Sequence, residues 1–306
     1  MFTSIDDAAA RLSAAGYLPS PEIATTVFLA DRMEKPLLVE GPAGVGKTEL
    51  ARAFAAAAGR VLVRLQCYEG LDESKALYEW EYAKQLLYTQ LLRDRLGDKV
   101  GDAPTLSDAA DRIAAEGNVF FSERFLLPRP VLRAILSPEP ALLLVDELDK
   151  ADPELEALLL EVLSDWAVTI PELGTVRARQ IPRVVLTSNA VRDLSDALKR
   201  RCLHLALDFP DRARELAIVR AAVPEAAEGL ARAVVAAVGQ LRTLELKKAP
   251  SISETLDWVR ALALLSADRL DAALLDATLN LVLKYEGDVA RARERKAELL
   301  AAAEGA

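Results

Sequence analysis

The sequence contains few of the residues on which several classes of protein depend. Its 306 residues include two cysteines, Cys67 and Cys202, and a single histidine, His204. Two cysteines that lie far apart and outside any CxxC pair suggest neither a disulfide framework nor a zinc knuckle. The histidine lies in the alternating run CLHLALDF, so we expect a half-buried strand residue and exclude histidine-based catalysis and histidine metal clusters.

The sequence also lacks an excess of positive charge and a long apolar stretch. Lys and Arg number 38 against 47 Asp and Glu, a formal net charge of −9, which argues against nucleic acid as the partner. The start MFTSIDDAAARL has two aspartates where a signal peptide is basic and then apolar, and no uncharged run reaches membrane-spanning length. We therefore expect a cytoplasmic protein without a membrane span.

What is present suits a globular protein with one large and one smaller domain, since 52% of the residues are hydrophobic and 28% are charged. Strands that alternate with helices predict a parallel α/β sheet, and the nearly continuous apolar run at 141–147 is typical of its central strand. Beyond Asp211 the pattern is helical, so we predict an α/β domain at 1–210 and a helical domain at 211–306. The predicted strands are 36–40, 60–67, 141–147, 183–189 and 203–209.

An insertion is expected between the second and third strands, because about 70 residues separate them, more than a simple crossover needs. Residues 73–97 have an amphipathic pattern and are expected to form one long helix. Residues 118–135 are expected to form an aromatic loop and a helix that begins at Pro130. The aromatic side chains expected to fill the core, rather than to touch a client, are Phe120, Phe121 and Phe125.

A hairpin is expected at 168–183, with Arg177, Arg179 and Arg183 on it. Two interpretations of these arginines stay open: a substrate contact that lines a pore, and an ordinary solvated hairpin.

Residues 41–48 match the pattern GxxxxGK followed by Ser or Thr, between a predicted strand and a predicted helix. In this motif backbone amides and the helix N-terminus hold phosphate, the lysine reaches the β- and γ-phosphates, and the hydroxyl holds Mg²⁺. We therefore expect ATP and Mg²⁺ as cofactors. The predicted nucleotide-binding residues are Gly41, Pro42, Ala43, Gly44, Val45, Gly46, Lys47, Thr48 and Glu49.

Polar residues at two strand ends narrow the choice among kinases, GTPases and ATPases. The run LLLVDE ends in Asp146 and Glu147: the first carboxylate can hold Mg²⁺ through water, and the second can accept a proton from the attacking water. The run TSN ends in Asn189, which would lie beside these carboxylates and orient that water, although asparagine in this position also forms turns. The pattern favours an ATPase.

The motifs GPAGVGKT, LLLVDE, TSN and ALKRRC, in this order over residues 36–210, resemble those of the AAA+ ATPases. More narrowly, LQCYEGLDESKALYEWEYAKQLL, FFSERFLLPRPVLRAI and TSNAVRDLSDALKRRC resemble the MoxR clade. The most similar branch is the CoxD type, accessory ATPases for the maturation of carbon monoxide dehydrogenase and related molybdenum enzymes. The resemblance implies a three-layer α/β domain with a helical lid, a hexameric ring of identical subunits, and a partner protein with a von Willebrand A domain.

The resemblance also implies roles for single residues. Lys47 and Thr48 correspond to the phosphate and Mg²⁺ ligands, Asp146 and Glu147 to the two carboxylates, and Asn189 to the first sensor. The arginine finger that reaches a neighbouring subunit's γ-phosphate corresponds to Arg201, with Arg200 as the alternative if the register differs by one.

The lid departs from the family pattern. Most AAA+ proteins have a sensor arginine at the start of a lid helix, whereas the corresponding stretch APSISETLDW has Glu254 near that position. Either the arginine is missing, or Arg260 or a basic residue of LKKAP replaces it.

Three functions remain open at this point. The resemblance implies a chaperone-like ATPase that helps to mature or activate a client metalloenzyme. A nucleic-acid motor of the AAA+ type shares the catalytic motifs, but the acidic charge and the lack of an appended DNA-binding module argue against it. A nucleotide-gated scaffold with little turnover would be consistent with a missing lid arginine.

Overall fold

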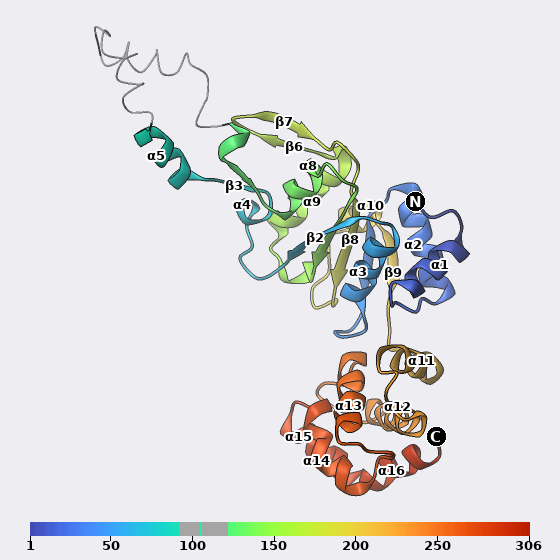
Figure 1. Cartoon of the computed structure of the whole chain (residues 1–306). Coiled ribbons are helices and arrows are strands. Elements are labelled where there is room, and N and C mark those ends of the chain that lie inside the picture. Colours follow the sequence, from blue (N-terminus) through green and yellow to red (C-terminus); the bar gives the residue numbers. More distant parts are fainter. Residues whose placement is uncertain (92–104, 106–121) are drawn as a thin grey trace.

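The computed structural model describes residues 1–91, 105 and 122–306. Its centre is a five-stranded sheet in the order β2-β5-β8-β1-β9, in which every neighbouring pair is parallel (Figure 1). All five predicted strands are present, so the predicted α/β fold is confirmed. The strands are β1 (Leu37–Glu40), β2 (Val61–Gln66), β5 (Ala141–Asp146), β8 (Arg183–Ser188) and β9 (Leu203–Ala206).

Helices cover both faces of the sheet, which gives three layers. Strands in a parallel sheet are joined by crossover helices, and these pack on its faces because the strands have apolar side chains on both sides. One face is covered by α1 (Ile5–Ala14), α2 (Pro21–Met33) and α3 (Lys47–Ala57). The other is covered by α8 (Pro130–Leu136), α9 (Pro153–Asp165) and α10 (Asp196–Arg201).

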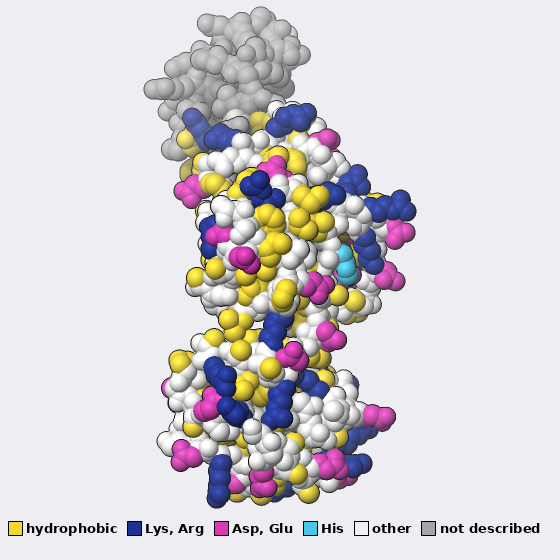
Figure 2. All heavy atoms as spheres, turned by 90° about the vertical axis from the view of Figure 1, so that its right-hand side faces the viewer, with side chains coloured by type: hydrophobic (Ala, Val, Ile, Leu, Met, Phe, Trp, Pro, Cys, Tyr) yellow, Lys and Arg dark blue, Asp and Glu magenta, His cyan; other side chains and the backbone are white. Residues whose placement is uncertain are grey.

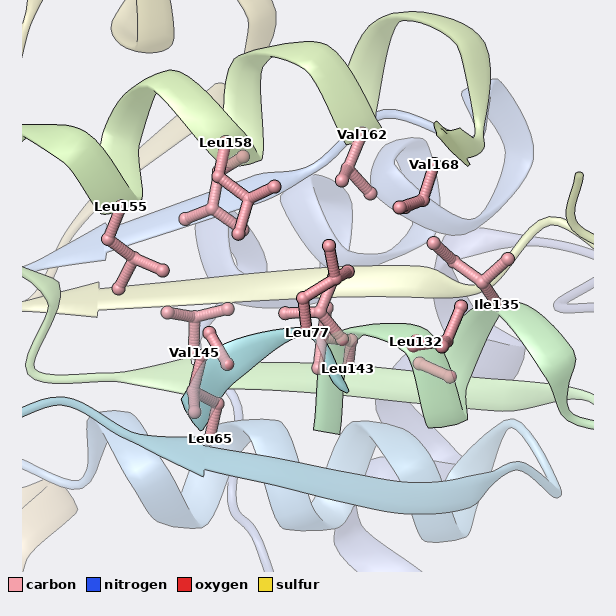
Figure 3. Close-up of a cluster of buried hydrophobic side chains, with 14 of the residues drawn as sticks. Leu65, Leu77, Leu132, Ile135, Leu143, Val145, Leu155, Leu158, Val162 and Val168 are labelled. Atoms are coloured by element: carbon pink, nitrogen blue, oxygen red, sulfur yellow. The ribbon is translucent and has the colours of Figure 1, made fainter. Parts of the chain in front are cut away.

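The core on the α9 side is shown in Figure 3. Leu155, Leu158 and Val162 recur at helical spacing along α9 and point at the sheet, where Leu143 and Val145 of β5 meet them. Burial of one such side chain contributes about 1.5–3 kcal/mol, so this face fixes the position of β5.

Side chains one residue away on the same strands point to the α3 side. Leu142 and Leu144 of β5 join the core there, and Asp146 continues this alternation at the end of the strand. On β2 the same alternation buries Val63 and Leu65 against α9, which leaves Arg64 and Gln66 on the face of α3. Polar side chains from neighbouring strands thereby gather at the carboxyl edge of the sheet.

The long helix predicted for 73–97 is wrong over its described part. The segment forms α4 (Glu73–Ala76), β3 (Tyr78–Trp80) and α5 (Tyr82–Leu91), and β3 pairs antiparallel with β4 (Leu126–Pro128). The reason is tertiary, because Leu77 and Trp80 enter the α9-side core and the strand finds a partner far along the chain. Residues 92–97 lie outside the described part.

The aromatic segment behaves as expected where it is described. Phe125 is buried in the core and meets the Tyr88 ring edge to face, with centroids 5.2 Å apart. Helix α8 begins at Pro130, as predicted. Phe120 and Phe121 lie outside the described residues.

The predicted hairpin is present as β6 (Ala167–Ile170) and β7 (Gly174–Arg177), with Arg177 and Arg179 exposed. Arg183, however, does not belong to it. This residue begins β8 and is 2% exposed, and its Nε donates to Asp31 Oδ1 at 2.9 Å. A buried arginine requires such a carboxylate partner, so Arg183 is a structural residue rather than a surface contact.

The chain after β9 is helical and has its own core, in which the Trp258 indole donates to Thr278 Oγ1 at 2.7 Å. Figure 1 shows these helices below the sheet, and Figure 2 shows a waist between the two parts. Among the described residues, none of the helices has both the length and the apolar character that a membrane crossing requires. The helices are α11 (Arg212–Ala222), α12 (Glu228–Arg242), α13 (Ile252–Leu264), α14 (Ala272–Val282), α15 (Glu286–Glu294) and α16 (Lys296–Glu304).

Candidate functional site

The glycine loop follows β1 and ends at Gly46, the N-cap of α3. Two of its glycines are required by their neighbours. A Cβ on Gly41 would lie 1.9 Å from the Leu207 carbonyl oxygen, and one on Gly44 would lie 2.3 Å from the Ser251 side chain. Gly44 also has φ +78°, which L side chains adopt at a cost. The loop is therefore confined between the segment after β9 and the start of α13.

Lys47 lies in the first turn of α3 and points back into the loop. Its Nζ donates to Gly41 O at 2.6 Å, to Pro42 O at 2.7 Å and to Asn189 Oδ1 at 2.8 Å. Burial lowers the pKa of Lys47, an effect opposed by the nearby carboxylates, of which Asp149 contributes most. The contact with Asn189 joins the loop to the end of β8, two regions that the sequence analysis assigned to one site.

Asp146 is buried beneath the loop at the end of β5. Its Oδ1 accepts from Thr48 Oγ1 at 3.0 Å and from Thr187 Oγ1 at 2.6 Å, while its Oδ2 accepts from Arg64 Nη2 at 2.6 Å. The predicted pair of Thr48 and Asp146 is thus brought together. Thr187 and Arg64 were not predicted. The available signal was strand alternation, because residues two positions apart on a strand point to the same face of the sheet.

Glu147 follows directly and has a left-handed backbone, with φ +58°. This turn directs its carboxylate to the surface of the site, where Oε2 accepts from Gln66 Nε2 at 2.9 Å and from Lys150 Nζ at 2.7 Å. Its backbone N–H donates to Thr187 Oγ1 at 2.8 Å. Glu147 is therefore near Asp146 but is held by two side chains that the sequence analysis did not identify.

A cavity of about 550 Å³ opens beside the loop, between the sheet part and the helical part. Its walls are partly apolar, and the half-buried Tyr17 on one side has a pKa raised to about 12 by its partial burial. A mixed cavity of this size next to a phosphate-type loop fits a nucleoside. The lining includes Tyr17, Leu18, Gly44, Glu49, Ile218 and Ile252.

Two arginines of the helical part line this cavity. Arg260 of α13, one of the predicted substitutes for a sensor arginine, reaches it and also pairs with Asp257 at 3.3 Å. Arg214 of α11 was not predicted; its Nη2 donates to Leu18 O at 2.9 Å, and its Nε is buried without a partner. Glu254 instead caps α13 through Ser251.

Of the remaining predicted residues, three lie in or next to the loop and one, Arg201, does not. Val45 is buried in the core, Ala43 is exposed on the loop, and Glu49 lines the cavity. Arg201 is not brought to this site within one chain. It ends α10, where its Nε donates to Ser164 Oγ at 3.2 Å and its Nη1 to Ala197 O at 3.3 Å.

His204 was expected to be half-buried, which is wrong. Its side chain is 52% exposed on the edge strand β9, and Nε2 lies 2.6 Å from Glu40 Oε2. Figure 2 shows the histidine at the surface in cyan. An edge strand has one side without a neighbour, and alternation alone does not reveal which strand is the edge.

The residues fit a nucleoside triphosphate with a divalent cation. Lys47 begins α3, and the backbone amides and dipole of a helix N-terminus favour phosphate. A hydroxyl and a carboxylate, Thr48 and Asp146, offer the oxygen ligands that Mg²⁺ requires. The orphan Arg214 Nε and the mixed cavity lie on the side where the nucleoside would continue.

The chain resembles one protein family and several known proteins. The family described as AAA domain (dynein-related subfamily) matches residues 36–202, the segment that contains the loop, both strand-end carboxylates, Asn189 and Arg201. Protein NorQ of Paracoccus denitrificans (strain Pd 1222) is 25% identical over 203 residues, which cover 66% of this chain and 63% of that protein.

Similar solved structures include the RuvB Holliday junction branch migration motor of Thermotoga maritima, with 17% identity and a TM-score of 0.44 over 85% of this chain and 66% of that chain. A mutant form of the same protein matches with 17% identity and a TM-score of 0.46, over 85% of this chain and 67% of that one. The chain spans 63% of NorQ and 66% of the first RuvB chain, less than two thirds of either.

Proposed function

The chain belongs to the AAA domain family, dynein-related subfamily, and is an ATPase of that family; on this basis we propose that it uses ATP hydrolysis to remodel a client metalloenzyme during maturation or activation. The observation that supports this proposal most strongly is that the carboxyl ends of β1, β5 and β8 lie together. Lys47 contacts Asn189, and Thr48 contacts Asp146, so that residues 142 and 98 positions apart in the chain form one pocket.

In this proposal Lys47 and the loop amides bind the phosphates, and Thr48 and Asp146 are the residues that would hold Mg²⁺. The ion would supply charge neutralisation on the phosphate oxygens. Glu147 accepts a proton from the attacking water, for which its carboxylate must exchange the contacts with Gln66 and Lys150 for the water. Asn189 orients that water, since its amide already lies beside the Lys47 ammonium.

Arg201 has no role in this site unless a second subunit approaches. Its position at the end of α10, away from the loop of its own chain, supports the proposal that it acts as a finger in a neighbour's site. The family forms rings, and we propose a hexamer of this chain. The α/β part at 1–210 would bind the nucleotide, and the helical part at 211–306 would act as the lid, with Arg214 and Arg260 as its nucleotide-facing cations.

The proposal extends to the MoxR clade and its CoxD-type branch. It rests on the segments LQCYEGLDESKALYEWEYAKQLL and FFSERFLLPRPVLRAI, which lie outside the general ATPase motifs, and on TSNAVRDLSDALKRRC, which joins two of those motifs. A carbon monoxide dehydrogenase-like client, a von Willebrand A domain partner and a cytoplasmic location follow from this assignment.

The catalytic part of the proposal is tested with Glu147→Gln. The amide keeps the shape of the side chain but cannot accept a proton, so phosphate release should fall about 10²–10⁴-fold while ATP remains bound. Phosphate release is measured continuously, and the bound nucleotide is identified after gel filtration. Glu154→Gln, at an exposed acid of α9, is the matched control and should hydrolyse ATP normally. Unchanged turnover of Glu147→Gln would assign the general base to another residue.

The client is tested with the same variant as a trap. Tagged Glu147→Gln and tagged Lys47→Ala are each purified from the native host and compared by mass spectrometry. We expect a metal-containing oxidoreductase and a von Willebrand A domain protein to be enriched with the ATP-bound trap alone. Nucleic acid bound to the trap with a steep dependence on salt would favour the motor instead. Negligible phosphate release by the wild type would favour the scaffold.

A further inference from the structure

Arg64 lies on the same face of the sheet as the candidate site. Its neighbours Val63 and Leu65 point into the α9-side core, so the strand alternation directs Arg64 toward α3. In the ladder between β2 and β5, Arg64 is opposite Leu144, and Gln66 is opposite Asp146. The Arg64 side chain therefore has to extend two residues along the sheet, toward its carboxyl edge, to reach Asp146.

The guanidinium makes this contact with two of its nitrogens. Nη2 lies 2.6 Å and Nε 3.1 Å from the same Asp146 oxygen, Oδ2, and Nη2 also donates to Gln66 Oε1. Asp146 is 2% exposed, whereas the Arg64 side chain is 41% exposed. Thr187 donates to the other oxygen, Oδ1, and the Thr48 hydroxyl lies 3.0 Å from Oδ1 and 3.1 Å from Oδ2. Arg64 is thus the cation that directly compensates a buried carboxylate.

This compensation matters because Asp146 lies beneath the loop that is proposed to bind phosphates. A buried carboxylate without a cation is strongly unfavourable. If phosphates bind to the loop while the metal is absent, an uncompensated Asp146 also repels them. A second cation at Oδ2 would in turn be repelled by the guanidinium. A metal ion on Oδ2 would therefore compete with Arg64 for this carboxylate.

We propose that Arg64 is a resident counter-ion of Asp146, which compensates this carboxylate in the metal-free state and leaves it when Asp146 serves Mg²⁺. This inference rests on the proposed role of Asp146. The exposed side chain gives the guanidinium room to swing into solvent. Arg64 Nη2 donates to the Gln66 side chain, which in turn donates to Glu147, the proposed general base. When Arg64 leaves, Gln66 loses this contact, and Glu147 is held less firmly.

The test measures how strongly Mg²⁺ improves nucleotide binding, without any need for turnover. A fluorescent ADP analogue is titrated into wild type and Arg64→Gln, once with EDTA and once with saturating Mg²⁺. The quantity of interest is the ratio of the Kd without Mg²⁺ to the Kd with it. In Arg64→Gln we expect weaker binding in EDTA and equal or tighter binding in Mg²⁺, so that the ratio rises about tenfold.

Three further variants separate this inference from simpler explanations. Arg52→Gln removes an exposed arginine of α3 and should leave the ratio unchanged. Arg64→Lys keeps the charge but not the two-nitrogen contact, so its ratio should lie between wild type and Arg64→Gln. In an Asp146→Asn background, Arg64→Gln should have no further effect on the ratio, because the two residues act as a pair.

The outcomes are distinguishable. A wild-type ratio near one would contradict the role of Asp146 in metal binding and thus the proposed function. A wild-type ratio well above one that Arg64→Gln and Arg64→Lys leave unchanged would overturn the inference about Arg64 alone. Should Arg64→Gln fail to fold, Arg64→Lys decides: a ratio equal to that of the wild type overturns the inference. A purely structural role would change both Kd values by the same factor.

Discussion

At the scale of single residues, Lys47 is the side chain whose loss should matter most for nucleotide binding. Its Nζ is the cation within the loop, and two loop carbonyls already fix its position. Lys47→Ala leaves the phosphates to backbone amides, so the affinity for ATP should fall about 100-fold, or roughly 3 kcal/mol. Calorimetric titration measures this. Lys35→Ala, at an exposed lysine just before β1, is the control. Wild-type affinity of Lys47→Ala would contradict the assignment of the loop.

The two thiols should be unreactive in the folded protein. Burial raises the pKa of Cys67 and of Cys202 to about 12 each. Since the raised pKa keeps both thiols protonated at pH 8, and the thiolate is the nucleophile, iodoacetamide should alkylate neither residue at that pH. In urea the pKa values return to ordinary values and both residues should react. Mass spectrometry of the intact protein counts the modifications, and rapid alkylation under native conditions would mean that the sites open.

The residues of the site differ in how well a sequence predicts them. A short local pattern predicts the loop, Asp146, Glu147 and Asn189, and its chemistry can be recognised before the fold is known. Arg64 and Thr187 belong to the site because they lie on strands next to β5 and point to the same face as Asp146. To predict this, the order of the strands must be known. Arg183 was misassigned for the same reason, because its partner Asp31 lies 152 residues away.

At the scale of elements, the contact between the loop and α13 should couple nucleotide affinity to the position of the helical part, the proposed lid. Gly44→Ala places a methyl group on the Ser251 side chain and forces alanine into a left-handed backbone. Gly59→Ala is the matched control, since Gly59 has φ +64° but nothing within 4 Å of the added Cβ. Both variants should lose about 1–2 kcal/mol of stability from backbone strain.

The two glycine variants should differ in nucleotide binding, because the Gly44 variant alone also displaces the start of α13. Thermal unfolding and titration with the ADP analogue give the two quantities for each variant. Equal nucleotide affinities for Gly44→Ala and Gly59→Ala would mean that the lid contact does not influence the loop.

The helices and strands also differ in how well the sequence pattern predicts them. The five strands of the sheet were predictable because buried parallel strands form short, nearly continuous apolar runs between helical patterns. The segment 73–91 was not, since its aromatic and leucine residues fit a helical period as well as a strand. Pairing of Tyr78–Trp80 with Leu126–Pro128 decided the outcome, and a contact across such a distance leaves no local signal.

At the scale of the whole molecule, the proposed ring requires that activity depend on two subunits at once. An arginine finger contributes about 10³–10⁵ in rate, so Arg201→Ala should bind ATP almost normally and hydrolyse it very slowly. Mixed with Lys47→Ala, it should regain some activity, because an intact pocket can meet an intact finger. Phosphate release by the two variants, alone and mixed, measures this.

Subunit exchange between labelled chains is the necessary control for that mixture. If exchange occurs and Arg201→Ala still hydrolyses ATP at the wild-type rate, the shared site does not involve Arg201. Arg200→Ala, at the neighbouring exposed arginine, is then the variant to measure.

The glycine loop is enclosed by two surfaces that belong to the joint between the sheet and the helical part: the Leu207 carbonyl beside Gly41 and the Ser251 side chain beside Gly44. In mechanical terms, the loop lies close to the fulcrum of a lever whose long arm is the bundle from α12 to α16. A slight widening of the loop would push on the short arm, and the far end of the bundle would then travel further. The orientation of the bundle should therefore change with what the loop holds.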